Sequence, residues 1–205
     1  MKKTYLIKPL FISSLMFLVF TGCVLKPKIN PNYKELRPSY VLVLPPENLT
    51  SGTEIEETVY PIIYEKLSRR GYYCLSPEVA RAIFNSNKLE DAGRINSINP
   101  QKFKELFGVD AILKVRVTEW ESKYYVIGSS VNVGFEMELI NTADGASLWS
   151  LKNLLSKAPS GNSNGILGAL VQAAVHAAMT PYEPIAEENA MNMVKTVPKG
   201  PYAKK

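Results

Sequence analysis

Hydrophobic positions follow two different periods along the chain, and the change between them divides the sequence. Up to about residue 108, apolar residues recur at helical spacing or form short continuous runs. The run over residues 40–44, ended by Pro45 and Pro46, predicts a strand that is buried on both faces. From residue 112 onward apolar and polar residues alternate, which is typical of strands with one buried face.

The first half also predicts helices. Apolar residues at a spacing of four indicate one helix, and they are Ile55, Val59, Ile63 and Leu67. Thr53 and Glu56 have the spacing of a capping box at its start, and Gly71 can end it. Pro61 removes an interior hydrogen bond, so we expect either a late start near Thr58 or a kink.

Two cap-and-proline pairs, Ser76-Pro77 and Asn99-Pro100, predict the starts of two further helices. In the first of them we expect Val79 and Ile83 to face the core. The polar stretch 85–97 between the helices is predicted to be a loop, and Tyr72 to Leu75 a short strand.

The alternating half predicts an antiparallel sheet. Segments 112–120 and 131–140 are the clearest strands, and Asp144-Gly145 is a hairpin turn signal before a third strand at 147–149. A further short strand is expected at 123–127. The apolar face should carry Val131, Val133, Phe135, Met137 and Leu139, and the polar face should carry ion pairs that involve Lys114, Arg116, Glu136 and Glu138.

The elements together predict one α/β (α+β) domain over residues 40–197. Its mixed, largely antiparallel sheet should have helices packed mainly on one face. A helix rich in small residues is expected at 165–179 and an amphipathic helix at 185–197. Residues 198–205 are predicted to be a basic tail.

The N-terminus resembles a bacterial lipoprotein signal. Lysines at positions 2, 3 and 8 precede an apolar run over residues 10–20, and the sequence Thr21-Gly22-Cys23 follows. Eleven positions are too few for a bilayer span of roughly 20 residues. The resemblance implies a signal peptide over residues 1–22, cleavage between Gly22 and Cys23, and S-diacylglycerol and N-palmitoyl groups on Cys23. The alternative is a plain secretory signal that happens to contain a cysteine.

The residues after the anchor change the charge and the reach of the protein. Residues 23–39 are predicted to be a lipid anchor and flexible tether, because three prolines interrupt a basic stretch. Val24, rather than aspartate, implies sorting to the outer membrane by resemblance to enterobacterial lipoproteins. Removing the three signal lysines lowers the net charge from +5 to +2, so the chain has no basic excess that would favour nucleic acid.

Several motifs resemble one family in particular. They are Gly71-Tyr72-Tyr73, the stretch from Phe107 to Ala111 (Phe-Gly-Val-Asp-Ala), and Asp144-Gly145 followed by Leu148-Trp149. The chain is similar over residues 10–197 to a family of bacterial surface lipoproteins, typified by a neisserial lipoprotein studied as a vaccine antigen. The resemblance implies a fold like the N-terminal domain of the Tol-system translocation protein. It also implies a non-catalytic role in the cell envelope, beside lipoproteins that resemble the curli secretion channel.

Catalytic chemistry has few candidates here. His176 is the single histidine and lies among alanines, so it offers no triad or metal site. Two carboxylate pairs, Glu119 with Glu121 and Glu136 with Glu138, each share a strand face, but solvated strands often show this pattern. The Gly-rich stretch 161–168 lacks the residues of a phosphate loop. Cys74 is expected to be a small buried side chain. We predict no catalytic, metal or cofactor residues.

A stripe of small residues is the remaining candidate surface. Gly165, Ala169, Ala173 and Ala177 recur every four residues, which permits close helix packing. The stripe can pack on its own sheet, or it can contact a second copy in a homodimer or another partner.

Three functions stay open on the sequence. The first is a non-catalytic accessory lipoprotein of an envelope secretion or transport complex, and the absence of catalytic motifs favours it. The second is a regulator of a periplasmic cell-wall enzyme, which a long tether would favour. The third, an envelope hydrolase, is disfavoured by the single histidine.

Overall fold

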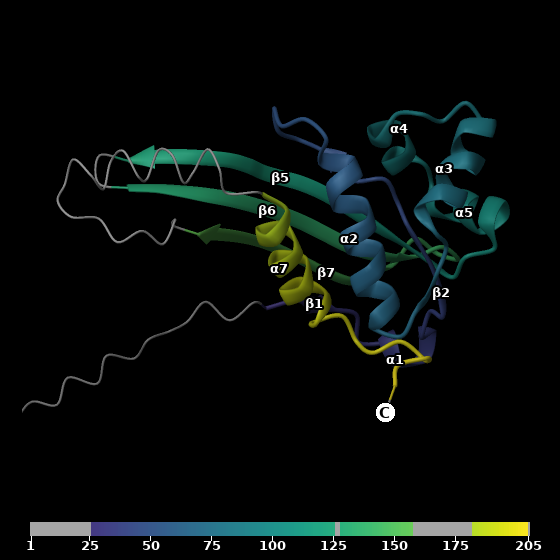
Figure 1. Ribbon diagram of the computed structural model, residues 1–205. Helices are drawn as coiled ribbons and strands as arrows, with labels where there is room; N and C mark the ends of the chain where they lie inside the picture. Colours follow the sequence, from purple (N-terminus) through teal and green to yellow (C-terminus); the bar gives the residue numbers. More distant parts are fainter. Residues whose placement is uncertain (1–25, 126–127, 158–181, 205) are drawn as a thin grey trace, which may run out of the picture.

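One mixed sheet runs through the computed structural model, which describes residues 26–125, 128–157 and 182–204 (Figure 1). The strands are β1 (Lys28–Ile29), β2 (Tyr40–Val43), β3 (Glu47–Asn48), β4 (Tyr73–Cys74), β5 (Ala111–Tyr125), β6 (Gly128–Asn141) and β7 (Ser147–Lys157). The helices are α1 (Tyr33–Leu36), α2 (Ile55–Arg69), α3 (Pro77–Ser86), α4 (Ala92–Ser97), α5 (Pro100–Phe107) and α7 (Tyr182–Val194).

The strand order is β1-β7-β6-β5-β2-β4, and β3 also pairs with β5. In this order the pairs β1-β7, β7-β6 and β6-β5 are antiparallel, whereas β2 is parallel to both β5 and β4. The predicted α+β class with a mixed, largely antiparallel sheet is therefore confirmed. The strand expected at 123–127 is wrong as a separate element, because β5 continues without a break to Tyr125.

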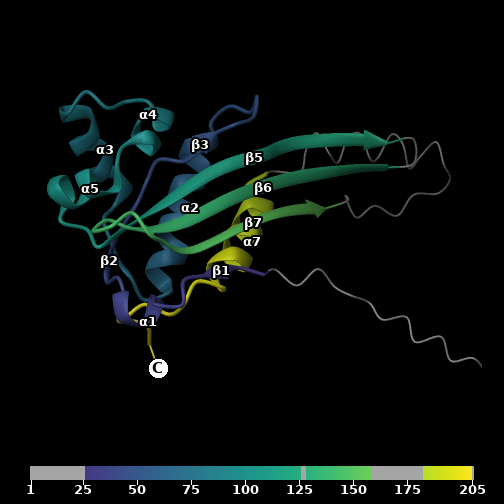
Figure 2. The ribbon, with the colours of Figure 1, turned by 180° about the vertical axis from the view of Figure 1, so that it is seen from behind.

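Helices cover the two faces of the sheet unequally. The two longest helices, α2 and α7, pack on one face of the sheet. They bury the main core, which includes Val41, Val115 and Phe135. The three short helices α3, α4 and α5 cover the opposite face only around β2 and the start of β5 (Figure 2). Leu42 and Ile112 lie in this second core. The rest of that face, along β5 to β7, carries no described helix.

Strand β2 explains why its sequence is continuously apolar. Val41 and Val43 point into the main core, while Leu42 and Leu44 point into the second core. All four side chains are fully buried. Burial on both faces, as expected for a strand between two parallel neighbours, is confirmed.

A β-bulge in β5 changes the face on which later residues lie. The register with β6 shifts between Val117 and Glu119, so Trp120 joins the buried face instead of the polar one. There its ring stacks on Tyr182 of α7 with centroids 5.0 Å apart. Gly134 lies opposite the bulge, where an added Cβ would stand 2.7 Å from the hydroxyl oxygen of Thr118.

Helix α2 differs at its start from the sequence prediction. The helix begins at Ile55 after Glu54, whose φ is 57°, and no side chain caps it, so the capping box was wrong. Pro61 lies inside the helix, and the late start near Thr58 is also wrong. At the other end Gly71 has a φ of +96°, which favours glycine, as expected for a helix terminator.

Helices α3 and α5 begin as predicted, since the side chains of Ser76 and Asn99 cap them. The buried face predicted for α3 is wrong, because Ala80 and Phe84 are buried whereas Val79 is 47% exposed. The loop expected at 85–97 contains α4, whose first turn is capped by Asp91. A side-chain cap can stabilise so short a helix, and polar composition alone does not indicate that a helix is present.

The segment expected to be a flexible tether is largely part of the domain. Strand β1 pairs with β7 at Trp149 and Ser150, and Tyr33 of α1 is buried in the main core. The tether prediction is therefore wrong from Lys28 onward. The prediction failed because backbone pairing at a sheet edge holds this segment, and such pairing needs no apolar pattern in the sequence.

The predicted basic tail is also packed against the body of the protein. Gly200 N and Tyr202 N donate to the carbonyl oxygens of Arg70 and Gly71 at 3.1 and 3.0 Å. The hydroxyl of Tyr72 bonds to that of Tyr33 and donates to Pro198 O at 2.7 Å. Three distant parts of the sequence thus meet at the end of α2.

Asp110 joins the start of β2 to the start of β5 and offers a test by pH. Its Oδ2 accepts from Ser39 N, Ser39 Oγ and Tyr40 N at 2.8–3.0 Å. Burial alone would raise the pKa of Asp110, but the bonds from Tyr40 and Ser39 outweigh it and lower that pKa. A lowered carboxyl pKa stabilises the fold above the unfolded-state value of about 3.9, and that contribution is lost as pH falls through the folded value.

We expect Asp110→Ala to lower the free energy of unfolding by about 1–2 kcal/mol at neutral pH. The deficit should begin to shrink as pH falls below the unfolded-state pKa of about 3.9, and it should go on shrinking as the folded carboxylate is protonated at lower pH. Urea unfolding over a series of pH values from neutral into acid measures it. A deficit that stays constant with pH would show that the charge of Asp110 contributes nothing.

Candidate functional site

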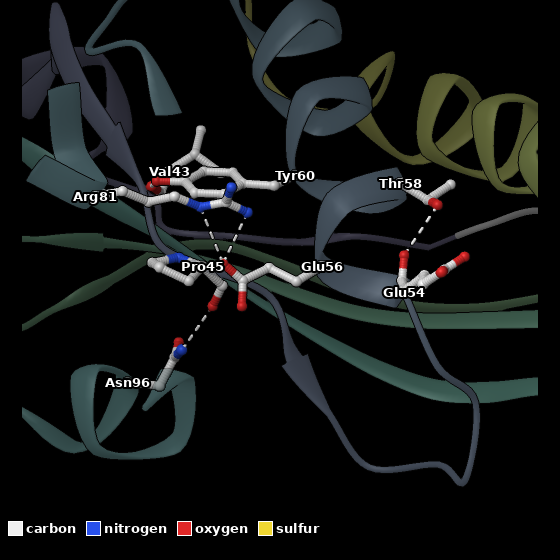
Figure 3. A network of polar contacts seen from close by, with 8 residues as sticks. All are labelled: Val43, Pro45, Glu54, Glu56, Thr58, Tyr60, Arg81 and Asn96. Carbon is white, nitrogen blue, oxygen red and sulfur yellow. Dashed lines mark hydrogen bonds and ion pairs between the residues drawn. The ribbon is translucent and has the colours of Figure 1, made fainter. Parts of the chain in front are cut away.

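The carboxyl end of β2 is the first place to look for a site, and a network of polar contacts surrounds it (Figure 3). The hydroxyl of Tyr60 donates to Val43 O at 2.7 Å, and burial raises the pKa of Tyr60. The guanidinium of Arg81 lies over the Tyr60 ring, 5.5 Å from its centroid, and donates to Glu56 Oε1 at 2.9 and 3.2 Å. This network joins α2, β2 and α3.

A separate set of contacts lies on the far side of the strand. Asn96 Nδ2 donates to Pro45 O at 2.9 Å, which fastens α4 to the end of β2 (Figure 3). Lys114 Nζ donates in turn to Asn96 O. These contacts make the end of β2 a structural joint between α2, α3 and α4, in which Asn96 Oδ1 stays buried without a hydrogen-bond partner among the described residues.

Next to this joint lies an acidic surface, which we name the acidic edge. One groove of about 790 Å³ runs between α2 and α7, and a second of about 480 Å³ adjoins it at the start of α2. Their lining includes nine of the 19 acidic residues of the chain: Glu47, Glu54, Glu56, Glu57, Glu65, Glu90, Asp91, Glu183 and Glu187. Several lie near the N-terminus of α2, where the helix dipole favours negative charge.

Some carboxylates of the acidic edge are held in ion pairs. Lys66 contacts both Glu65 and Glu187, and Arg69 contacts Glu65 at 2.7 Å. The hydrogen bond from Lys66 lowers the pKa of Glu65, and the bond to Glu187 raises that of Lys66. Glu54, Glu57 and Glu183 are exposed, so the surface presents negative charge to solvent.

The open face of the sheet brings together the carboxylates proposed as acid–base candidates. A groove of about 750 Å³ on this face is lined by Glu119, Glu136 and Glu138, together with Lys26, Lys28 and Lys152. Arg116 pairs with Glu136 at 3.7 Å, which confirms an expected cross-strand ion pair. Lys114 lies opposite Glu138 in the register, but its ammonium bonds to Asn96 instead.

The second carboxylate pair has the same character. Lys123 lies within ion-pair distance of both Glu119 and Glu121, at 3.9 and 2.6 Å. All these side chains are partly exposed to solvent. The arrangement is that of a solvated face with ion pairs, each of which contributes little to stability.

Nucleophile and metal chemistry have weak support in the described residues. Cys74 is buried as expected, and burial raises its pKa to about 11, which keeps the thiol protonated and unreactive. No three His, Cys, Asp or Glu side chains in the described ranges are grouped so that they could hold a metal ion. Within the same ranges, no helix has the length and apolarity to cross a membrane.

Several predicted sites lie outside the described residues. They are the lipidation and cleavage positions Cys23 and Gly22, the small-residue stripe of Gly165, Ala169, Ala173 and Ala177, the Gly-rich stretch 161–168, and His176. Sequence reasoning in turn missed the acidic edge. The run Glu54-Ile55-Glu56-Glu57 was a local signal for it, but the contributions of residues 90–91 and 183–187 required the fold.

Comparison with known proteins gives a consistent match. The family model described as "Putative lipoprotein GNA1162-like" matches residues 30–197. A lipoprotein of Neisseria meningitidis serogroup B is 30% identical over 172 residues, which cover 82% of this chain and 80% of that protein. The crystal structure of lipoprotein GNA1162 from Neisseria meningitidis is 28% identical, covers 70% of this chain and all of that chain, and aligns with a TM-score of 0.55.

A more distant structure shares the fold alone. The PelC dodecamer from Paraburkholderia phytofirmans is 16% identical, covers 86% of this chain and 98% of that chain, and aligns with a TM-score of 0.52. The family resemblance expected from the sequence is confirmed by the matches above.

Proposed function

The chain belongs to the GNA1162-like family of lipoproteins, and from that premise we propose that it is a lipid-anchored, non-catalytic accessory component of an envelope secretion or transport complex. Lipidation of Cys23 and residence in the outer membrane, indicated by Val24, are parts of the proposal. A cysteine with a diacylglyceryl group and an N-palmitoyl chain anchors a protein stably, since each buried methylene contributes ~0.8 kcal/mol.

The observation that carries the proposal is the position of β1. This strand begins at Lys28, only five residues after Cys23. Five residues span at most about 18 Å when fully extended. A domain joined by so short a link stays beside the membrane, where it can contact the other membrane-bound parts of an assembly.

The surfaces of the domain support binding rather than chemistry. The Tyr60 and Arg81 network at the end of β2 joins helices to the sheet, and Cys74 is buried. Glu119, Glu121 and Glu136 are held in ion pairs. The acidic edge, in contrast, presents several exposed carboxylates that suit a partner with a basic surface.

The alternative, a regulator of a cell-wall enzyme, depended on how far the tether could extend from the membrane. A tether over residues 23–39 could have extended on the order of 40–50 Å. Because residues 28–37 are paired and packed on the domain, that reach is lost. The link therefore favours a partner in or on the same membrane.

Cross-linking in cells, followed by capture of the protein and mass spectrometry, tests the proposal. We expect the captured partner to be a membrane-bound component of a secretion or transport complex. Reversing two charges of the acidic edge, Glu57→Lys with Glu183→Lys, should lower its recovery about tenfold or more, since like charges at an interface cost several kcal/mol.

The matched control reverses two exposed glutamates away from the acidic edge, Glu78→Lys with Glu105→Lys, and should keep wild-type recovery. Capture of a peptidoglycan synthase instead would contradict the proposal and support the regulator. Turnover of an envelope polymer by the purified protein would contradict the non-catalytic role.

A further inference from the structure

A second charged surface lies at the C-terminal end of α2, opposite the end where Glu54 and Glu57 of the acidic edge lie. A groove of about 430 Å³ there is lined by Arg69, Arg70, Lys199 and Lys204, with Tyr202 beside them. Lys34 of α1 and Arg37, which directly follows α1, are both exposed nearby. We name these six basic residues the basic underside.

Contacts within the structure hold together the three segments that carry these residues. Arg70 Nε donates to Val197 O at 2.7 Å, just before Lys199 in the sequence. Tyr33 of α1 bonds to Tyr72, which in turn bonds to Pro198 O. Helix α1 and the C-terminal segment accordingly lie together at the same end of the molecule in both views (Figures 1 and 2).

Large apolar and aromatic side chains are exposed around the basic residues. Tyr202 is 67% exposed, and Leu36 of α1 is 40% exposed. Ile29 of β1, four residues before α1, is 46% exposed. Basic side chains interspersed with tyrosine and aliphatic residues are the composition that suits a membrane interface.

The position of the anchor adds an independent constraint. The chain enters the domain through β1, which directly precedes α1 and the basic underside. The proposed lipid on Cys23 would be at most about 18 Å of chain from Lys28. Glu54 and Glu57 of the acidic edge lie at the far end of α2, whose 15 residues rise about 22 Å at 1.5 Å each. Glu65, in contrast, lies one turn from Arg69 and pairs with it.

We propose that the basic underside rests on anionic lipid headgroups of the membrane that holds the anchor, with the acidic edge directed away from it. The inference rests on the proposed lipid anchor. Phosphate groups match the arginines and lysines of the groove, while a negative surface repels the acidic edge. The same orientation presents the acidic edge to a protein partner.

Lysine footprinting of the full lipidated protein in vesicles tests this orientation. An amine-acetylating reagent is applied to protein in pure phosphatidylcholine vesicles and in vesicles with about 30% phosphatidylglycerol. We expect Lys199 and Lys204 to react about threefold or more slowly on the anionic vesicles, because the negative surface attracts the basic underside and shields these amines. Lys88, exposed just after α3, should react equally on both.

A pair of matched variants isolates the charge. Lys34→Gln with Arg37→Gln should restore much of the reaction at Lys199 and Lys204, whereas Lys88→Gln with Lys104→Gln should leave their protection unchanged. Equal reaction of the two lysines on both vesicle types would overturn the inference while leaving the anchor intact.

Two further outcomes also decide the matter. Protection that rises with protein concentration in detergent, without vesicles, would mean that a second copy covers the basic underside, and would overturn the inference. Protein that washes off both vesicle types would overturn the proposed lipid anchor itself, and the orientation with it.

Discussion

Replacing Phe135 with alanine is expected to lower the free energy of unfolding by roughly 3–5 kcal/mol. Phe135 is fully buried in β6, between Val117 of β5 and Asn153 of β7 in the sheet register. Helix α7 closes the core above β6, where Asn189 Nδ2 donates to Val133 O at 2.8 Å. A cavity at this point cannot collapse easily, so the loss should be near the upper end for one side chain.

The control is the next residue along the same strand. Glu136 points to the open face and is 39% exposed at its side chain, with Arg116 as its partner at 3.7 Å. Glu136→Ala should cost about 0.5 kcal/mol or less. Urea unfolding of the two variants measures the difference, and equal midpoints would show that the register of β6 is misassigned.

The sequence predicted the elements whose signals are local. Alternation placed Phe135 and Met137 on the buried face of β6, and both are fully buried. Ser76 and Asn99 were recognised as helix caps because a short polar side chain stands directly before a proline. Each of these signals lies within one strand or one turn, so no tertiary contact is needed to read it.

The sequence did not predict the segments that depend on backbone contacts with distant partners. Residues 28–29 pair with β7 about 120 positions later, and residues 200–202 bond to the end of α2. Their sequences are rich in proline and lysine, which by composition indicates a solvated segment. A single aromatic, Tyr33, holds α1 in the core, and one aromatic in a polar stretch is too weak a signal.

The candidate sites also differ in whether the sequence alone can reveal them. Cys23 could be found from the sequence because the lipoprotein signal is a contiguous motif. The acidic edge collects side chains from β3, α2, the start of α4 and α7, and the basic underside collects them from α1, α2 and the C-terminal segment. Charges separated by over a hundred residues form one surface only once the fold is known.

Replacing Cys23 with alanine should have the largest effect on the protein in cells. Alanine cannot carry the thioether-linked diacylglyceryl group, and without acyl chains the chain loses the stable anchoring that two or more lipids provide. We expect the variant to accumulate as uncleaved precursor or to be found in the soluble fraction, whereas the wild-type protein stays with the membranes.

Fractionation of cells followed by immunoblotting measures this redistribution, with Cys74→Ala as the matched control. Cys74 is the other cysteine of the chain, and its buried position on β4 gives it no role in anchoring. Fatty-acid label that persists on the Cys23→Ala protein would show that a different residue carries the lipid.

The mass of the N-terminal peptide of the membrane-extracted protein shows whether Cys23 carries the lipid anchor. We expect a mature chain that begins at Cys23 and carries a diacylglyceryl group on sulfur and an acyl chain on the α-amine. This modification would place the lipid five residues before β1. A mature chain that begins at Val24 or later, or that begins at an unmodified Cys23, would contradict both the anchor and the short link on which the proposed function depends.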